Sequence, residues 1–274
     1  MKVFAHNFNP SSNSGPNKFT RQLFRNLIKQ NLVEPVNNAS EADIEFFLIQ
    51  QQQEKTKPSV LRLDGIYFNS AQDYNQQNKS IFYAYSNADA VIFQSDFNRQ
   101  LIENWFGKHK NGSVIHNAPD LEITRRANSD FWNNRPELPR VKKGVEVWSC
   151  ASSWRPHKRL RDNIRYFMEM ADDKAIFLIA GEGAKDSDFS EAKDLLGKRI
   201  FYLGNLDYIT LLSLYRRSST FVHLAYLDHC PNVVVDALAC DCHVVCSSSG
   251  GTKELVNKGK GTVIIEDPWD YAPI

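Results

Sequence analysis

The sequence predicts an α/β protein with two domains, each built on a parallel sheet. Short apolar segments alternate with amphipathic, helix-like segments, and this series occurs twice. A stretch rich in Pro, Asn, Arg and Lys, residues 117–144, separates the two series. Apolar strands that helices cover on both faces are typical of parallel sheets, which bind ligands beyond the carboxyl ends of their strands. We expect the two domains to face each other across a cleft.

Eleven apolar segments are the expected strands. In the first domain they span 3–6, 44–49, 60–63, 90–94 and 114–116. In the second domain they span 145–150, 175–180, 200–203, 220–224, 243–246 and 262–265. We place the first domain at 1–125, a linker at 126–143, the second domain at 144–265 and a tail at 266–274.

The composition excludes several classes of protein. Lys and Arg total 33 and Asp and Glu total 32, so the net charge of +1 gives no general attraction to nucleic acid. The sequence shows no signal peptide, and no segment approaches the roughly 18 apolar residues that span a bilayer. The five cysteines lack the paired C-x-x-C spacing of structural zinc sites and indicate reduced thiols. We expect a soluble, cytoplasmic protein without a metal site.

Two aspartates separated by seven residues, Asp228 and Asp236, form the most informative motif. Pro231 suits the first position of a helix, because its missing N–H would be unpaired there. The backbone amides around residues 231–234 and the helix dipole would then favour a phosphate. Asp228 would lie at the mouth of this site, and Asp236 could accept two hydrogen bonds from a ribose diol. A loop acid followed by a solvated helix acid fits the same pattern.

Basic residues follow the first strand of the second domain. Arg155 and Lys158 lie in the expected strand-to-helix loop, where a guanidinium fork and a mobile ammonium can hold a diphosphate and stabilise its growing charge. A solvated basic loop is the alternative interpretation.

Glycines occur in several of the expected loops. Gly181 and Gly183 follow the segment 175–180, and Gly250 and Gly251 follow the segment 243–246. Glycine lets a backbone approach a ligand closely, and it suits a helix start that binds phosphate. Gly15, in the first loop of the chain, could let that loop close over a sugar or an acceptor. A plain tight turn requires the same residue type at each of these positions.

Two further features belong to the first domain. Asp64 follows the segment 60–63, where its carboxylate could contact a sugar hydroxyl or act as a base, or simply form a turn. A helix after the first strand has one basic face, and its inward face is expected to contain Phe19, Leu23, Leu27 and Ile28. The basic face consists of Lys18, Arg21, Arg25 and Lys29. Such a face is typical of contact with an anionic acceptor or a membrane surface, and equally of a solvated helix.

Taken together, these motifs resemble glycosyltransferase family 4. The resemblance rests on SWRPHK (153–158), LIAGEG (178–183), the segment 200–203 with Gly204, the Asp228 and Asp236 pair, and SGG (249–251), and it covers about residues 80–260. It implies a GT-B fold with two Rossmann-like domains, a nucleotide-sugar donor, retention of anomeric configuration and no required metal.

The resemblance also implies roles for individual residues. Asp236 would hold the ribose, Asp228 would contact the transferred sugar, Arg155 and Lys158 would bind the diphosphate, and the backbone at Pro231, Asn232 and Val233 would add contacts. Both acids are Glu in the usual family motif, and the Arg-to-Lys spacing is shorter here. The first domain lacks an obvious sugar-contacting His, a role that Asp64 would take.

We therefore expect a retaining glycosyltransferase that moves a hexosyl or pentosyl group from a UDP- or GDP-sugar to a glycan or lipid-linked acceptor. No cofactor besides this donor is expected, and peripheral membrane contact is compatible with the basic helix. A nucleotide-sugar 2-epimerase and a non-catalytic nucleotide-sugar-binding module are the alternatives.

Overall fold

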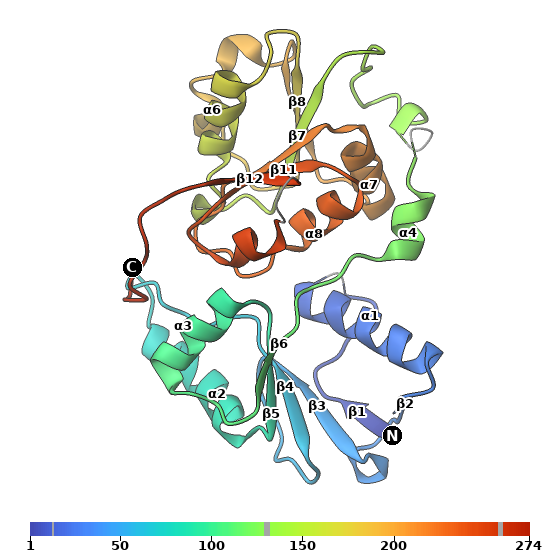
Figure 1. Cartoon of the computed structure of the whole chain (residues 1–274), viewed down its shortest axis with the longest axis vertical. Helices are drawn as coiled ribbons and strands as arrows, with labels where there is room; N and C mark the ends of the chain where they lie inside the picture. The colour runs from blue at the N-terminus through green and yellow to red at the C-terminus, as the bar shows by residue number, and fades with distance from the viewer. Residues whose placement is uncertain (13, 129–131, 257–259) are drawn as a thin grey trace. The chain divides into compact units, whose positions relative to one another are not determined.

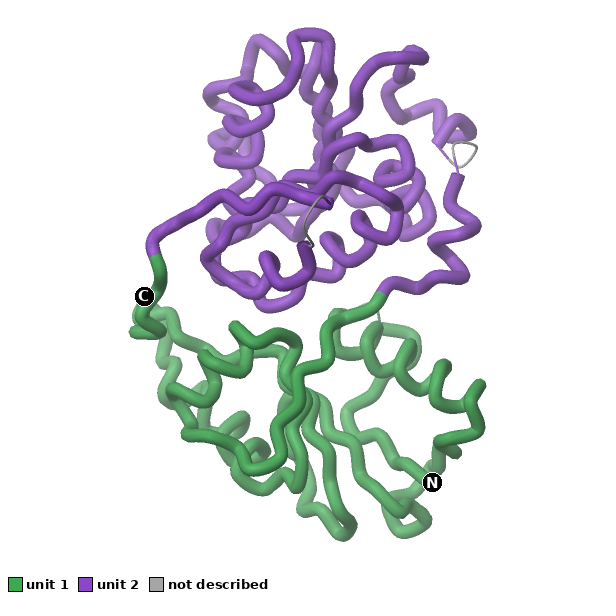
Figure 2. Tube along the Cα trace, in the orientation of Figure 1, with its two compact units in different colours: residues 1–118, 268–274 green, residues 119–267 purple. Residues whose placement is uncertain are grey.

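A computed structural model describes residues 1–12, 14–128, 132–256 and 260–274 of the 274-residue chain. These residues form two compact units (Figure 2). Unit 1 contains Met1–Ala118 and Pro268–Ile274, and unit 2 contains Pro119–Asp267. Each unit is built on a six-stranded sheet in which every pairing is parallel (Figure 1), which confirms the predicted α/β class.

Unit 1 has the strand order β2-β1-β3-β4-β5-β6. Its strands are β1 (Lys2–Ala5), β2 (Glu34–Pro35), β3 (Ile44–Leu48), β4 (Ser59–Arg62), β5 (Ala90–Phe93) and β6 (Gly112–Val114). Its helices are α1 (Gly15–Lys29), α2 (Tyr74–Asn87) and α3 (Asp96–Phe106). Alternate residues of β3 face opposite sides of the sheet, because side chains alternate along a strand. Phe46 packs in the cluster that contains Phe24 of α1, and Phe47 packs with Ile81 of α2 and Leu101 of α3.

The inward face of α1 differs in part from the predicted one. Phe19 is buried and Leu23 and Leu27 are partly buried, as expected, but Ile28 is 43 % exposed and Phe24 is buried instead. Ile28 is nine residues from Phe19 and therefore lies about 180° from it round the helix. This angle places Ile28 at the edge of the inward face, next to Phe24.

Unit 2 has the strand order β12-β11-β10-β7-β8-β9. Its strands are β7 (Val147–Ala151), β8 (Ile176–Ala180), β9 (Ile200–Gly204), β10 (Thr220–His223), β11 (His243–Ser247) and β12 (Gly261–Ile264). Its helices are α4 (Leu121–Arg126), α6 (Leu160–Met170), α7 (Tyr208–Arg217) and α8 (Asn232–Ala239). Phe177 packs with Phe167 of α6 on one face, and Leu178 packs with Leu212 of α7 and Val234 of α8 on the other.

Each of the eleven predicted strands overlaps an observed strand, with ends that differ by at most two residues. The two-residue strand β2 was not predicted, because it is too short to show periodicity. No helix of the described ranges is both long and apolar enough to cross a membrane.

Two segments outside the sheets pack into the cores. Within the stretch 126–143, treated above as a linker, Trp132 and Leu138 are buried in the cluster that α7 and α8 also form. The last residues of the chain return to unit 1, where the amide of Ile274 donates to the carbonyl of Phe68 at 3.0 Å. The rings of Trp269 and Phe68 lie 4.9 Å apart between centroids.

The loops after β7 and β8 lie in close backbone contact. The amide of Trp154 donates to the carbonyl of Glu182 at 2.7 Å, and the Trp154 indole donates to the carbonyl of Ala180 at 3.0 Å. Gly181 has φ 107°, and a Cβ added there would lie 1.7 Å from the carbonyl oxygen of Ser152. Glycine is therefore required at this position by the neighbouring loop.

A buried carboxylate fixes the loop before β4 in unit 1. Glu45 is fully buried, and its Oε1 accepts hydrogen bonds from the amides of Thr56 and Lys57 at 2.6 and 2.9 Å. Its Oε2 lies 2.6 Å from Nε2 of His6. Burial by itself raises the pKa of Glu45, but these hydrogen bonds outweigh burial and lower the pKa below its usual value.

The lowered pKa predicts that Glu45 stabilises unit 1 above the unfolded-state pKa, and that this stability is lost as the pH falls through the folded-state pKa. We expect Glu45→Gln to lower the free energy of unfolding by about 3 kcal/mol at about pH 7 and to reduce its decline toward acid pH. Hydrogen exchange of β1 and β3 amides would measure both effects. The exposed Glu34→Gln is the control, and equal exchange in the two variants would contradict the prediction.

The contact of Gly181 with the Ser152 loop predicts that Gly181→Ala lowers stability more than Gly197→Ala does. Gly197 also has a positive φ, of 73°, but a Cβ added there would meet no atom within 4 Å. Gly197→Ala should therefore lower stability by about 1–2 kcal/mol through its backbone conformation alone. Gly181→Ala should lower it by more than about 4 kcal/mol, because the Ser152 loop must move as well. Thermal unfolding of the two variants would show this difference, and similar unfolding temperatures would refute it.

Candidate active site

Most of the predicted site residues of unit 2 lie in or directly after four loops, which span 152–159, 181–185, 224–231 and 248–250. These loops follow β7, β8, β10 and β11, which are neighbours in one parallel sheet. The carboxyl ends of parallel strands meet at the same edge, so the four loops share one edge of the sheet of unit 2.

Lys158 and Asp228 come from different loops and form an ion pair. Nζ of Lys158 lies 2.5 Å from Oδ2 of Asp228, and Nε2 of His223, the last residue of β10, lies 3.0 Å from the same oxygen. The side chains of Lys158, Asp228 and His223 are 16, 13 and 4 % exposed. The structure thus brings together two predicted catalytic residues and adds His223, which the sequence analysis did not single out.

The surroundings fix the charges of this cluster. Burial by itself raises the pKa of Asp228, but Lys158 and the hydrogen bond from His223 outweigh burial and hold that pKa well below its usual range. Burial lowers the pKa of His223 in spite of Asp228. Near neutral pH Asp228 is therefore an anion and His223 is neutral, so Nε2 of His223 donates its proton to the carboxylate.

The helix α8 begins one residue later than predicted. Pro231 is its N-cap rather than its first helical residue, because the Pro231 backbone is extended, with ψ 123°. The carbonyl of Pro231 accepts hydrogen bonds from the amides of Val234 and Val235 at 3.1 and 3.2 Å. The amides of Asn232 and Val233 come before the first amides that donate within the helix. They are therefore the amides that the end of α8 offers to an anion.

Asp236 is the fifth residue of α8 and is only 2 % exposed. The hydroxyl of Tyr208, at the start of α7, donates to Oδ1 of Asp236 at 2.9 Å. Burial raises the pKa of Tyr208, and Asp236 raises it further, so the phenol keeps its proton. Sequence reasoning missed Tyr208, because its contact with Asp236 joins two helices that are distant in the sequence.

A pocket of about 150 Å³ is lined by two of these loops, those after β7 and β8, together with α8 and the segment after β9. Its lining includes Ser152 after β7, Gly181 after β8 and Val233 on α8. Asn205 and Leu206, which follow β9, also line it and were not predicted. The sequence signal that could have pointed to them is Gly204, which ends β9.

The predicted glycines after β11 contact the backbone of Asp228. The amide of Gly251 donates to the Asp228 carbonyl at 2.8 Å, and a Cβ at Gly250 would lie 2.4 Å from that oxygen. Leu227 has a positive φ of 55°, and its amide donates to Oγ of Ser249 at 3.2 Å. A strained residue beside a candidate catalytic acid is a frequent feature of active sites.

The remaining glycine after β8, Gly183, also makes a backbone contact. It has φ 87°, and a Cβ there would lie 2.7 Å from the carbonyl oxygen of Trp154. Glycine at 181, 183 and 250 thus allows neighbouring loops to pack closely against one another. The sequence alone does not reveal this reason for the glycines.

The two arginines near Lys158 have different surroundings. Arg155, which was predicted to bind diphosphate, is exposed in the loop after β7. Arg159, which was not predicted, lies with its guanidinium 4.6 Å from the ring centre of Tyr226 and 2.6 Å from Oε1 of Glu266. Arg159 therefore links the loop after β10 to the segment after β12.

Two predicted residues lie in unit 1. Gly15 is the first residue of α1, after the N-cap Ser14. Asp64 follows β4, and its side chain is 36 % exposed and paired with the buried Arg62. Nε2 of Gln94 donates to Oδ1 of Asp64 at 3.1 Å. The carboxylate of Asp64 is therefore held by two donors from its own unit.

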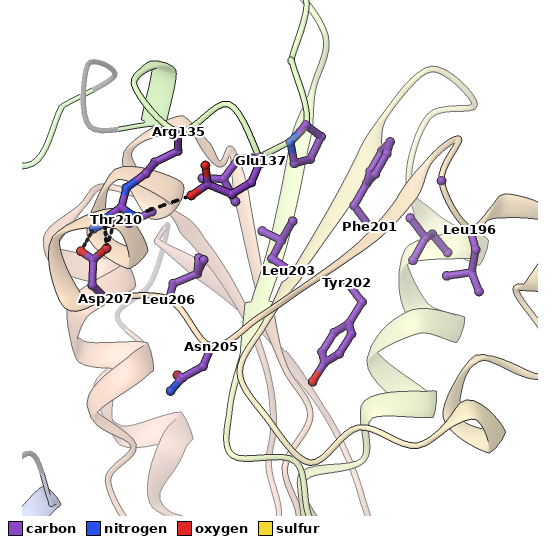
Figure 3. Close-up of a pocket in the computed structure, with 14 residues that line it drawn as sticks. Arg135, Glu137, Leu196, Phe201, Tyr202, Leu203, Asn205, Leu206, Asp207 and Thr210 are labelled. Atoms are coloured by element: carbon purple, nitrogen blue, oxygen red, sulfur yellow. Dashed lines mark hydrogen bonds and ion pairs between the residues drawn. The ribbon is translucent and has the colours of Figure 1, made fainter.

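A larger pocket, of about 510 Å³, lies along the edge strand β9 (Figure 3). At one end Arg135 forms ion pairs with Glu137 and Asp207. Asn205 and Leu206 line both this pocket and the smaller one, so the two adjoin. Within the described residues, no three His, Cys, Asp or Glu side chains are grouped as metal ligands.

Residues 130–272, more than half of the chain, match the family described as Glycosyl transferases group 1. Comparison with curated proteins gives no match. Similar solved structures include sucrose-phosphate synthase from Thermosynechococcus elongatus, with a TM-score of 0.71, 14 % identity, and coverage of 99 % of this chain and 87 % of that chain. Anabaena HepE in complex with UDP-glucose has a TM-score of 0.64 and 16 % identity, with 98 % and 86 % covered.

WaaG, a glycosyltransferase involved in lipopolysaccharide biosynthesis, has a TM-score of 0.65 and 10 % identity, with 97 % and 86 % covered. At these identities the structural likeness shows the fold, and it agrees with the two parallel six-stranded sheets. The chain therefore belongs to the glycosyl transferases group 1 family, and it is a glycosyltransferase with the GT-B fold.

Proposed function

We propose that this glycosyltransferase takes its sugar from a nucleotide-sugar donor and transfers it to a hydroxyl group with retention of anomeric configuration. The observation that carries the proposal is the Lys158–Asp228 pair in the loops that lead into α6 and α8. An ammonium group and the amides of Asn232 and Val233 suit a diphosphate, and a carboxylate held beside them suits the hydroxyl groups of the attached sugar.

The charge of Lys158 supports this assignment. In the structure its ammonium is paired with Asp228. A bound diphosphate brings further negative charge and competes for the same ammonium, while His223 continues to donate to Asp228. As the diphosphate departs, its charge grows, and Lys158 stabilises it best at that stage.

The proposed reaction needs no side-chain base. The bond from C1 of the sugar to the diphosphate oxygen breaks, and the acceptor oxygen bonds to C1 on the same face. The proton of the acceptor hydroxyl passes to a diphosphate oxygen, so the products are the glycoside and the nucleoside diphosphate. Asp64 would contact a hydroxyl of the sugar or the acceptor. We propose that the reaction needs no metal ion.

We propose a UDP-sugar as the first choice of donor and a GDP-sugar as the second. Two similar structures support this order: HepE in complex with UDP-glucose, and a UDP-forming trehalose-phosphate synthase from Burkholderia xenovorans, with a TM-score of 0.63 and 13 % identity. For the acceptor we propose a glycan or a lipid-linked sugar, in line with the role of WaaG in lipopolysaccharide biosynthesis.

The proposed role of Lys158 predicts a large loss of activity in Lys158→Gln. We expect kcat/KM for the donor to fall by about 10²–10³-fold, because a preorganised charge for the departing diphosphate is removed. Release of nucleoside diphosphate would measure this, with thermal unfolding as a check of the fold. The control is Lys174→Gln, an exposed lysine just before the amino end of β8. Equal activity of the two variants would exclude this role.

The proposed contact of Asp236 with ribose predicts weaker donor binding in Asp236→Ala, by at least about 1 kcal/mol in calorimetry. Tyr208→Phe removes only the hydroxyl that donates to Asp236 and leaves the carboxylate in place. We expect its donor affinity to stay within about 0.5 kcal/mol of the unmodified protein. If both variants lose affinity equally, the pair acts as a structural unit and the ribose contact is wrong.

A further inference from the structure

We infer that His223 is a positioning residue, which keeps the carboxylate of Asp228 directed at the transferred sugar after Lys158 has moved to the diphosphate. The inference rests on the proposed function, because it requires a nucleotide-sugar donor at this edge of the sheet of unit 2. His223 takes no part in the bond changes of the proposed reaction, and its side chain is 4 % exposed. The role assigned to it is to act through Asp228.

The two carboxylate oxygens of Asp228 have different surroundings. Oδ2 accepts hydrogen bonds from Nζ of Lys158 at 2.5 Å and from Nε2 of His223 at 3.0 Å. Oδ1 accepts none from the described residues, and the side chain remains 13 % exposed. A carboxylate oxygen has two lone pairs, so Oδ1 is the oxygen available to sugar hydroxyl groups.

The main chain of Asp228 is held in place by the neighbouring loop. Its carbonyl accepts a hydrogen bond from the amide of Gly251 at 2.8 Å, and the backbone of Gly250 lies too close to it for a side chain. The freedom that remains to Asp228 is rotation about its side-chain bonds. Hydrogen bonds to Oδ2 restrict this rotation and thereby determine the direction of Oδ1.

The two donors to Oδ2 differ in their freedom to move. Lys158 carries its ammonium on a flexible four-carbon stem, and its side chain is 16 % exposed in the loop after β7. His223 is the last residue of β10, and its short, rigid ring lies nearly parallel to that of Phe221, with 12° between the planes. A diphosphate can therefore attract Lys158 away from Asp228, whereas the ring of His223 stays beside it.

His223 also lowers the cost of moving Lys158. If both donors left Oδ2, an almost buried carboxylate would lack any hydrogen bond from the described residues, which is unfavourable. Burial lowers the pKa of His223, so near neutral pH its ring offers a hydrogen bond without a positive charge for the diphosphate to attract. The carboxylate of Asp228 thus keeps one donor throughout donor binding.

The test is calorimetric binding of UDP-glucose and of UDP to the purified full chain, with GDP-mannose and GDP as the second pair. The ratio of the two affinities within a pair isolates the contribution of the sugar. His223→Leu removes one donor to Oδ2, and we expect this ratio to fall by about ten-fold, typical of a hydrogen bond to a charged group. The affinity for the nucleotide without the sugar should change little.

Two conservative variants separate positioning from packing. The side-chain nitrogen of Gln lies about as far from the main chain as Nε2 of His, whereas that of Asn corresponds to Nδ1 and is too near. His223→Gln should therefore recover most of the ratio, and His223→Asn should not. His243→Leu is the control, because His243 lies at the amino end of β11, with Nε2 2.9 Å from Oγ1 of Thr262. Its ratio should equal that of the unmodified protein.

A double variant tests whether His223 acts through Asp228. Asp228→Ala lacks the carboxylate, so adding His223→Leu to it should lower the ratio no further. Thermal unfolding verifies the fold of each variant, and the comparison of His223→Gln with His223→Asn decides if His223→Leu does not fold.

Equal ratios in His223→Gln and His223→Asn overturn the positioning role. An equal loss from His223→Leu with and without the Asp228 carboxylate overturns it as well. In both cases the unmodified protein still binds a donor, so the proposed function stands. If the unmodified protein binds neither pair, the proposed function fails, and the role of His223 fails with it.

Discussion

Parallel pairing of β10, β7 and β8 determines where the polar residues of unit 2 lie. Apolar side chains fill both faces of these strands, so chemically active groups are confined to the strand ends and the loops that follow. Because all three strands run in the same direction, Lys158 and Asp228 meet at one edge although 70 residues separate them. The ion pair between them, and with it the proposed donor site, follow from this arrangement.

Backbone contacts, rather than side-chain packing, hold that edge in place. Gly181 lies against the carbonyl of Ser152, and Gly250 lies against that of Asp228, at distances that leave no room for a side chain. The acid of the site is therefore positioned by the loop after β11 as well as by its own loop. His223 at the end of β10 and Lys158 in the loop after β7 then keep its carboxylate ionised.

The sequence predicted the features that depend on local pattern. Apolar periodicity located the strands, and the parallel-sheet rule placed Lys158 and Asp228 at one edge before any contact was known. Features that depend on contacts between distant residues were not predictable. Tyr208 reaches Asp236 from another helix, and His223 appeared only as the end of a strand. Ile28 was misplaced because the angular limits of an inward face depend on the neighbouring sheet.

The return of the last residues to unit 1 makes that unit discontinuous in the sequence. Trp269 covers Phe68 and also lies 6.3 Å from Phe97, and the carbonyl of Tyr271 accepts a hydrogen bond from the indole of Trp105. A gene fragment that encodes only residues 1–118 would leave this aromatic surface facing water. Expression of unit 1 by itself therefore calls for a design that joins residues 268–274 to it through a short artificial linker.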